Sequence, residues 1–107
     1  MIRLDVDTGL SQEQNLEIER ILAHNPQVEK AILIGSRAMG NFKPGSDVDI
    51  VLSGTGLESQ TVHVVADQLN EETNIPYFFD ILDLSQLRNS ELLRHIEEYG
   101  ITIYEKG

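Results

Sequence analysis

Two aspartates separated by one residue, Asp47 and Asp49, are the side chains in this sequence that most directly suggest chemistry. The run from Val48 to Leu52 is otherwise apolar and mostly β-branched, which predicts a strand. Because side chains alternate along a strand, both carboxylates are expected on one face, with the apolar side chains on the other. Two carboxylates a few ångströms apart repel by up to about 4 kcal/mol at an effective dielectric of about 20. A cation between them would offset that repulsion, and magnesium binds carboxylate oxygens.

An Asp-x-Asp tripeptide is weak evidence when it stands alone. The chain contains a second copy, Asp5-Val6-Asp7, in its N-terminal segment, where no other residue suggests a site. The interpretation of Asp47 and Asp49 therefore depends on what lies near them in the fold.

A third carboxylate, Asp80, interrupts the apolar run from Tyr77 to Leu82. That run is typical of a central strand buried on both faces. A carboxylate buried there without a partner would cost several kcal/mol, so Asp80 is expected to meet a basic group, a hydrogen-bond network or a metal. If its strand neighbours the Asp47–Asp49 strand, Asp80 joins the same cluster. Asp83 is expected to face the other way, as a helix-entry or surface residue.

Gly35 and Ser36 follow the β-branched apolar run from Lys30 to Ile34, which predicts a buried strand. Glycine lets a phosphate approach the backbone, and the Ser36 hydroxyl and following amides can donate to phosphate oxygens. The alternative is an ordinary strand-to-helix turn with Ser36 as the helix N-cap, and an isolated Gly-Ser favours that alternative.

The elements that must position these residues follow from capping signals and hydrophobic periodicity. Ser11 with Gln14 resembles a capping box, and Gly100 is expected to be a helix C-cap. We expect helices over about 11–24, 58–72 and 85–99, with 89–90 as a breaking point in the last one, and one helical turn over 36–40. Strands are expected over 30–34, 48–52, 77–82 and 101–104. The order α-β-β-α-β-α-β predicts an α/β (α+β) fold with a mixed sheet of about four strands flanked by helices.

Composition narrows the function classes. The 107 residues are expected to form one domain, 1–107, with no second core for substrate recognition. No cysteine is present, which excludes thiol nucleophiles and zinc–thiolate sites. A formal net charge of −10 disfavours direct nucleic-acid binding and suggests either no macromolecular partner or a basic protein partner. The sequence shows no signal peptide and no apolar stretch long enough for a membrane span, so a cytoplasmic protein is expected.

Taken together, the motif Gly35-Ser36, the ten residues before Asp47-Val48-Asp49, and the later Asp80 resemble the signature of the DNA polymerase β superfamily. More narrowly, they resemble the minimal nucleotidyltransferases that act as antitoxins of HEPN-domain proteins. The resemblance covers nearly the whole chain. It implies that Gly35, Ser36 and Arg37 hold the triphosphate of ATP, and that Asp47, Asp49 and Asp80 are catalytic and bind two Mg²⁺ ions.

The same resemblance implies transfer of AMP from ATP to a hydroxyl of a HEPN-domain toxin, with Asp80 helping to deprotonate that hydroxyl. Two alternatives stay open: an antitoxin that neutralises its partner by contact with weak catalysis, and nucleotide transfer to a small molecule. The sequence does not identify the preferred nucleotide base or the acceptor of the nucleotide. It also does not show whether the protein forms a homo-oligomer or a hetero-oligomer.

The remaining polar residues near the motif are ambiguous. Arg37 is balanced between contacting phosphate and pairing locally with an acid, whereas Lys43 is expected to be a solvated loop charge. The three histidines, His24, His63 and His95, have no common spacing and are expected to be surface or packing residues.

Overall fold

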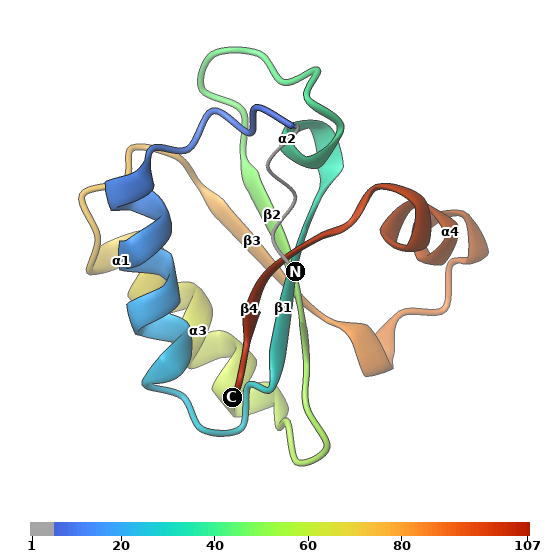
Figure 1. Ribbon diagram of the computed structural model, residues 1–107. Helices are drawn as coiled ribbons and strands as arrows, with labels where there is room; N and C mark the ends of the chain where they lie inside the picture. The colour runs from blue at the N-terminus through green and yellow to red at the C-terminus, as the bar shows by residue number, and fades with distance from the viewer. Residues whose placement is uncertain (1–5) are drawn as a thin grey trace.

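The computed structural model describes residues 6–107, and it forms a mixed four-stranded sheet flanked by helices (Figure 1). Along the chain the elements are α1 (Gln12–Ala23), β1 (Lys30–Ile34), α2 (Gly35–Met39), β2 (Val48–Ser53), α3 (Ser59–Glu71), β3 (Phe79–Asp83), the short 3₁₀ helix η1 (Leu84–Gln86), α4 (Ser90–Tyr99) and β4 (Ile101–Glu105). The strand order is β3-β2-β1-β4. Strand β1 pairs antiparallel with β2 and β4, and β2 pairs parallel with β3. This confirms the expected α+β class and mixed sheet.

The long helices begin and end where local chemistry directs them. Ser11 caps α1 through a complete capping box with Gln14, as expected. Asn89 caps α4 by accepting from the backbone N–H groups of Glu91 and Leu92. The helix expected over 85–99 is therefore two elements, η1 and α4, because Asn89 takes an extended conformation between them. Gly100 is the C-cap of α4, although its φ of −58° is not left-handed.

The hydrophobic core lies between the sheet and the pair α1 and α3, which Figure 1 shows side by side on one side of the sheet. Ile18 and Leu22 of α1 and Val65 and Leu69 of α3 are fully or almost fully buried. Helix α4 lies on the other side of the molecule in the same view, and it contacts β1 and α2. The sheet therefore has a thick apolar layer on one face and a thinner cover on the other, and this second face carries the candidate site.

One expectation about the sheet is wrong. The run from Tyr77 to Leu82 does not form a central strand buried on both faces, because β3 is the end strand of the described sheet. Phe78, which precedes the strand, is 59% exposed, and Asp80 is exposed. An apolar run marks a strand, but it does not reveal how many neighbours that strand has.

Candidate active site

Asp49 and Asp80 are direct neighbours across the parallel pair β2–β3, where their Cα atoms are register partners. Asp47 lies one residue before β2, and the buried Val48 and Ile50 point to the core face, opposite to Asp49. The expectation that Asp80 lies on the strand next to Asp47 and Asp49 is therefore confirmed. Its expected burial is wrong, because the sheet edge leaves Asp80 exposed while Asp49 is half-buried.

Gly35 connects β1 to α2 and packs directly against Asp49. Its φ is +76°, a left-handed conformation that glycine adopts without steric cost. A Cβ atom built on Gly35 would meet the Asp49 Oδ2 atom, so the carboxylate would have to turn away before a side chain could fit there. The register explains this approach, because Ile34, the last residue of β1, is the partner of Asp49 on β2. Ser36 follows inside α2 and is not its N-cap, which is Ile34.

Among the three aspartates Asp47, Asp49 and Asp80, Asp49 shows the electrostatic effect of the others in its pKa. The pKa of Asp49 is raised above 3.8, first by burial, then by the negative charges of Asp80 and Asp47. A positively charged His95 imidazole would act in the opposite direction and lower the pKa of Asp49. The fold therefore holds the ionised carboxylate in an unfavourable place, and a cation or a hydrogen-bond donor would relieve it.

Hard oxygen donors of this kind fit magnesium by chemical type. Their mutual repulsion, visible in the raised pKa of Asp49, is what a divalent ion would neutralise. Among residues 6–107, however, no group of three carboxylate or imidazole side chains converges as a ready metal site. Asp47, Asp49 and Asp80 thus supply suitable donors in one neighbourhood, and metal binding would require their side chains to turn toward a common point.

The structure gives Arg37 a different set of contacts from either interpretation of the sequence. Its side chain is 1% exposed, and its Nε and Nη2 atoms donate to the Ser46 carbonyl at 3.1 and 2.8 Å. The Nη1 atom donates to the Thr8 carbonyl at 2.9 Å, and the guanidinium lies 4.1 Å from the Tyr77 ring centroid. Arg37 thereby fixes the residue that precedes Asp47. Triphosphate binding by this guanidinium stays a prediction that its buried position does not favour, whereas Lys43 is exposed in the loop.

The sequence interpretation missed His95. Its Nε2 atom accepts a hydrogen bond from the Gly35 backbone N–H at 2.9 Å, across 60 residues of chain. The imidazole also lies 5.4 Å from the Tyr99 ring, centroid to centroid. No spacing in the sequence connects α4 to the turn after β1, so only the tertiary contact between α4 and α2 identifies this histidine.

In the second Asp-x-Asp tripeptide, Asp5-Val6-Asp7, the structure describes Val6 and Asp7. Asp7 is exposed, and its Oδ1 atom accepts from the Gly9 N–H at 2.9 Å, which is a local turn interaction. Asp5 lies outside the described residues.

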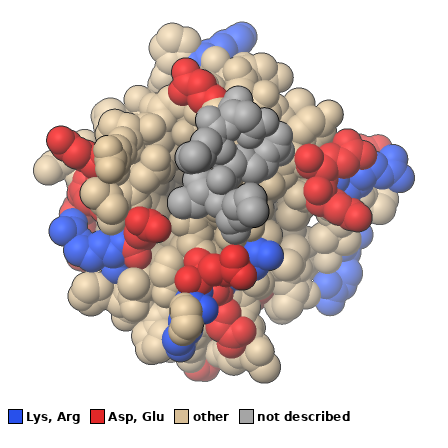
Figure 2. Space-filling view, viewed as in Figure 1, with Lys and Arg blue, Asp and Glu red and all other residues tan. Residues whose placement is uncertain are grey.

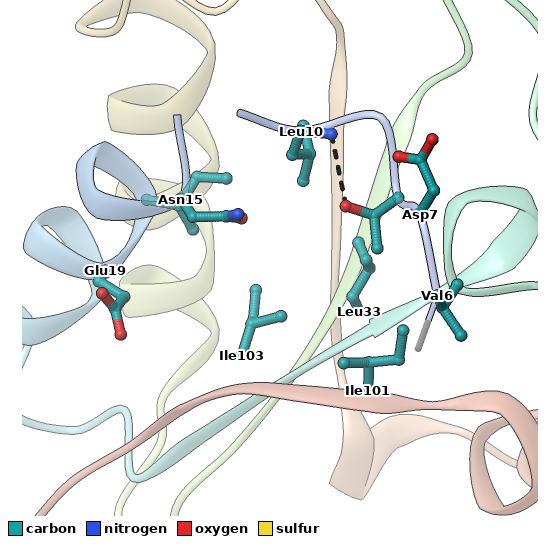
Figure 3. Close-up of a pocket in the computed structure, with 10 residues that line it drawn as sticks. Val6, Asp7, Leu10, Asn15, Glu19, Leu33, Ile101 and Ile103 are labelled. Atoms are coloured by element: carbon teal, nitrogen blue, oxygen red, sulfur yellow. Dashed lines mark hydrogen bonds between the residues drawn. The ribbon is translucent and has the colours of Figure 1, made fainter. Parts of the chain in front are cut away.

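A pocket of about 240 Å³ lies between α1, the segment before it, and strands β1 and β4 (Figure 3). Figure 3 shows Leu33, Ile101 and Ile103 on its floor and Asn15 and Glu19 of α1 along one wall. Leu33 pairs with Ile50, and alternation places Asp49 on the opposite face of the sheet. The aspartate cluster is therefore not in this pocket.

The fold and this arrangement define a class. The mixed four-stranded sheet with its flanking helices matches the fold of polymerase-β-like nucleotidyltransferases. The family model described as "Polymerase beta, Nucleotidyltransferase" matches residues 16–107, and the chain belongs to this family. A comparison with curated proteins gave no significant match. No helix within residues 6–107 combines the length and apolar character that a membrane span requires.

Several solved structures share the fold. A toxin–antitoxin structure with AMP-PNP superposes with a TM-score of 0.70 at 21% identity, covering 86% of this chain and 73% of that one. The MNT antitoxin in complex with the tri-AMPylated Shewanella oneidensis HEPN toxin gives 0.66 at 20% identity, covering 89% and 72%. A toxin–antitoxin MntA–HepT structure gives 0.67 at 19% identity, covering 90% and 74%. At these identities the likeness is one of fold.

Proposed function

We propose that this chain is a magnesium-dependent nucleotidyltransferase that moves AMP from ATP to a hydroxyl of a HEPN-domain toxin, as the antitoxin of that toxin. The observation that carries the proposal is the packing of Gly35 against Asp49, with Asp80 beside Asp49 on the next strand. This places a turn suited to phosphate against carboxylates suited to a metal–nucleotide complex. The fold neighbours support the nucleotide and the partner, because one is a structure with AMP-PNP and another contains an AMPylated HEPN toxin.

The proposed reaction is an in-line displacement at the α-phosphorus of ATP. The acceptor oxygen forms a new bond to this phosphorus, the bond to the bridging oxygen of the β-phosphate breaks, and pyrophosphate leaves. We assign the acceptor proton to Asp80. Its exposure at the sheet edge suits an acceptor carried by another protein, because a macromolecule can approach an edge strand more readily than a buried one.

Asp47, Asp49 and Asp80 would hold two magnesium ions, and bound ions would offset the charge of the phosphates and of the carboxylates. In the same proposal Ser36 donates its hydroxyl to a phosphate oxygen, and Gly35 leaves room for the phosphate by lacking a side chain. Arg37 holds the Ser46 carbonyl and thereby orients the entry to Asp47. The raised pKa of Asp49 is consistent with a carboxylate awaiting a cationic partner.

The charge of the chain supports a protein partner over nucleic acid. With 18 acidic and 8 basic residues, the chain has an excess of carboxylates that repels a phosphate backbone. Figure 2 shows acidic side chains at several separate places on one face, with basic side chains beside some of them. A basic partner surface would complement this distribution. The proposal keeps the cytoplasmic location expected from the sequence.

The test is transfer of label from α-labelled ATP in the presence of magnesium, with and without a HEPN-domain toxin as the acceptor protein. We expect label on the HEPN protein, and its loss in the Asp47→Ala/Asp49→Ala double variant. Asp67→Ala/Glu71→Ala is the matched control, because it removes the same two charges from exposed positions on α3. This control should transfer label at the wild-type rate.

Toxin neutralisation measured in parallel separates the enzyme from a binding antitoxin. If the Asp47→Ala/Asp49→Ala variant neutralises the toxin as well as the wild type and no label moves in either, the chain acts by contact. Label appearing only on an added small-molecule alcohol, and never on the HEPN protein, would replace the protein acceptor with a small one.

A further inference from the structure

The backbone N–H of Gly35 is a donor that its own helix cannot satisfy. Gly35 is the first residue of α2, and the first N–H groups of a helix have no partner within it. The N-cap residue, Ile34, makes no side-chain capping bond. The acceptor comes instead from α4, where His95 Nε2 receives the Gly35 N–H at 2.9 Å.

Gly35 is thus confined from two directions. On the side of its Cα atom it lies so close to the Asp49 carboxylate that a Cβ would force this carboxylate to turn, and its N–H is hydrogen-bonded to His95. A displacement of Gly35 in either direction would move Ser36, the next residue, and would change the space around Asp49. The imidazole therefore contacts the proposed phosphate turn at Gly35, the residue that packs against Asp49.

His95 is itself well placed to act as a fixed support. It sits in the middle of α4, which Asn89 caps at its N-terminus and which contacts both β1 and α2. The half-buried imidazole lies against the Tyr99 ring one turn further along the helix. This hydrogen bond belongs to the neutral imidazole, whose Nε2 carries no proton and presents a lone pair to the Gly35 N–H.

We propose that His95 is a positioning residue of the nucleotide site, holding the Gly35–Ser36 turn against Asp49 through the Gly35 N–H. Its place in a nucleotide site rests on the proposed function, whereas its hold on the turn does not. His95 touches the turn and not the reacting atoms, so its loss should weaken nucleotide binding more than it slows the chemical step. The Gly35 N–H is already engaged in this arrangement, so the Ser36 hydroxyl and the backbone amides after Gly35 are the groups left to meet phosphate oxygens.

The test compares two replacements of His95 with one matched control. His95→Leu removes the acceptor but keeps an apolar group of similar reach, and His95→Gln offers a carbonyl oxygen as a new acceptor. His63→Leu makes the same chemical change at an exposed position of α3. Far-UV circular dichroism and urea unfolding establish that each variant is folded before any comparison is made.

The first readout needs no nucleotide. In ¹H–¹⁵N spectra of the free protein, the Gly35 amide should shift upfield and exchange its proton faster in His95→Leu, and return toward the wild-type position in His95→Gln. His63→Leu should leave this amide unchanged. A Gly35 amide that is identical in the wild type and His95→Leu would overturn the proposal, whatever the activity of the protein.

The second readout is the transfer reaction. We expect the KM for ATP to rise about fivefold to tenfold in His95→Leu, the effect of losing about one hydrogen bond, with kcat changed less than twofold and KM largely restored in His95→Gln. Equal losses in the leucine and glutamine variants would indicate that only packing matters and would overturn the positioning role. If the wild type transfers no nucleotide and binds no ATP, the proposed function fails, and the Gly35 amide alone decides whether His95 holds the turn.

Discussion

Replacing Gly35 with alanine should lower both the stability and the activity of this protein, and the same replacement at Gly45 serves as the control. Gly35 and Gly45 have almost the same left-handed backbone, with φ of +76° and +81°. Any residue with a Cβ atom pays about 1–2 kcal/mol in this conformation. At Gly45 a new Cβ would meet nothing within 4 Å, whereas at Gly35 it would meet Asp49 Oδ2. The two substitutions therefore share the backbone term and differ in the contact with the carboxylate.

We expect Gly45→Ala to lower the free energy of unfolding by about 1–2 kcal/mol and Gly35→Ala by about 2–4 kcal/mol. The additional loss arises because the carboxylate must turn away, which is an overpacking cost of about 1–3 kcal/mol that rotation of the short Asp49 side chain relieves in part. Urea unfolding followed by far-UV circular dichroism measures both values, since the chain contains no tryptophan.

Function should separate the two variants more sharply than stability does. Gly35→Ala should reduce nucleotide transfer at least about 100-fold, because it displaces a proposed catalytic carboxylate by a large part of an ångström. Gly45→Ala should transfer nucleotide at nearly the wild-type rate.

A double-mutant cycle identifies the obstruction. In an Asp49→Ala background, Gly35→Ala should cost no more than Gly45→Ala does in the wild type, because the carboxylate is gone. If Gly35→Ala and Gly45→Ala destabilise equally in the wild type and both keep full ATP affinity, the close approach of Gly35 to Asp49 has no energetic or functional meaning. The geometric argument for the site would then be wrong.

Three further predictions concern the charges around this turn. The Arg37→Met variant should lower the free energy of unfolding by about 2–4 kcal/mol, because it leaves two backbone carbonyls without their charged donor. The control variant Arg20→Met, at an exposed position, should change this free energy by less than about 0.5 kcal/mol in the same urea assay. The raised pKa of Asp49 means that the folded state binds this proton more tightly than the unfolded state, so stability is lost as pH rises from about 3.8 through the folded pKa. The Asp49→Asn variant should therefore gain stability relative to the wild type between about pH 4 and 7. A stability difference that does not change with pH would contradict this reasoning. Asp80→Asn should lower the pKa of Asp49, followed by ¹³C carboxyl titration, and should do so more than Asp47→Asn does, because Asp80 is the larger of the two charge contributions.

The sequence by itself determined the elements and most of their ends. Alternation along 48–52 and helical periodicity along 11–24 and 58–72 are local properties, and a strand or helix carries them regardless of its neighbours. The capping box at Ser11 and the turn at Gly35 are local in the same sense. The sequence also indicated that Asp80 would join Asp47 and Asp49 if their strands were adjacent, and the register of β2 and β3 meets that condition.

Tertiary structure alone decided which of these residues are buried and what they touch. Strand β3 looked central because its sequence is apolar, yet sheet order depends on the packing of all four strands, and it left Asp80 at an exposed edge. Arg37 looked like a phosphate ligand or the partner of an acid, yet the folded loop placed two backbone carbonyls around its guanidinium. His95 carried no signal at all, because its bond to Gly35 joins positions 60 residues apart. The hydrophobic periodicity of a segment shows only which side of that helix or strand is apolar. Contacts such as those of Arg37 and His95 join segments that are far apart in the sequence, and no local pattern shows which segments will meet.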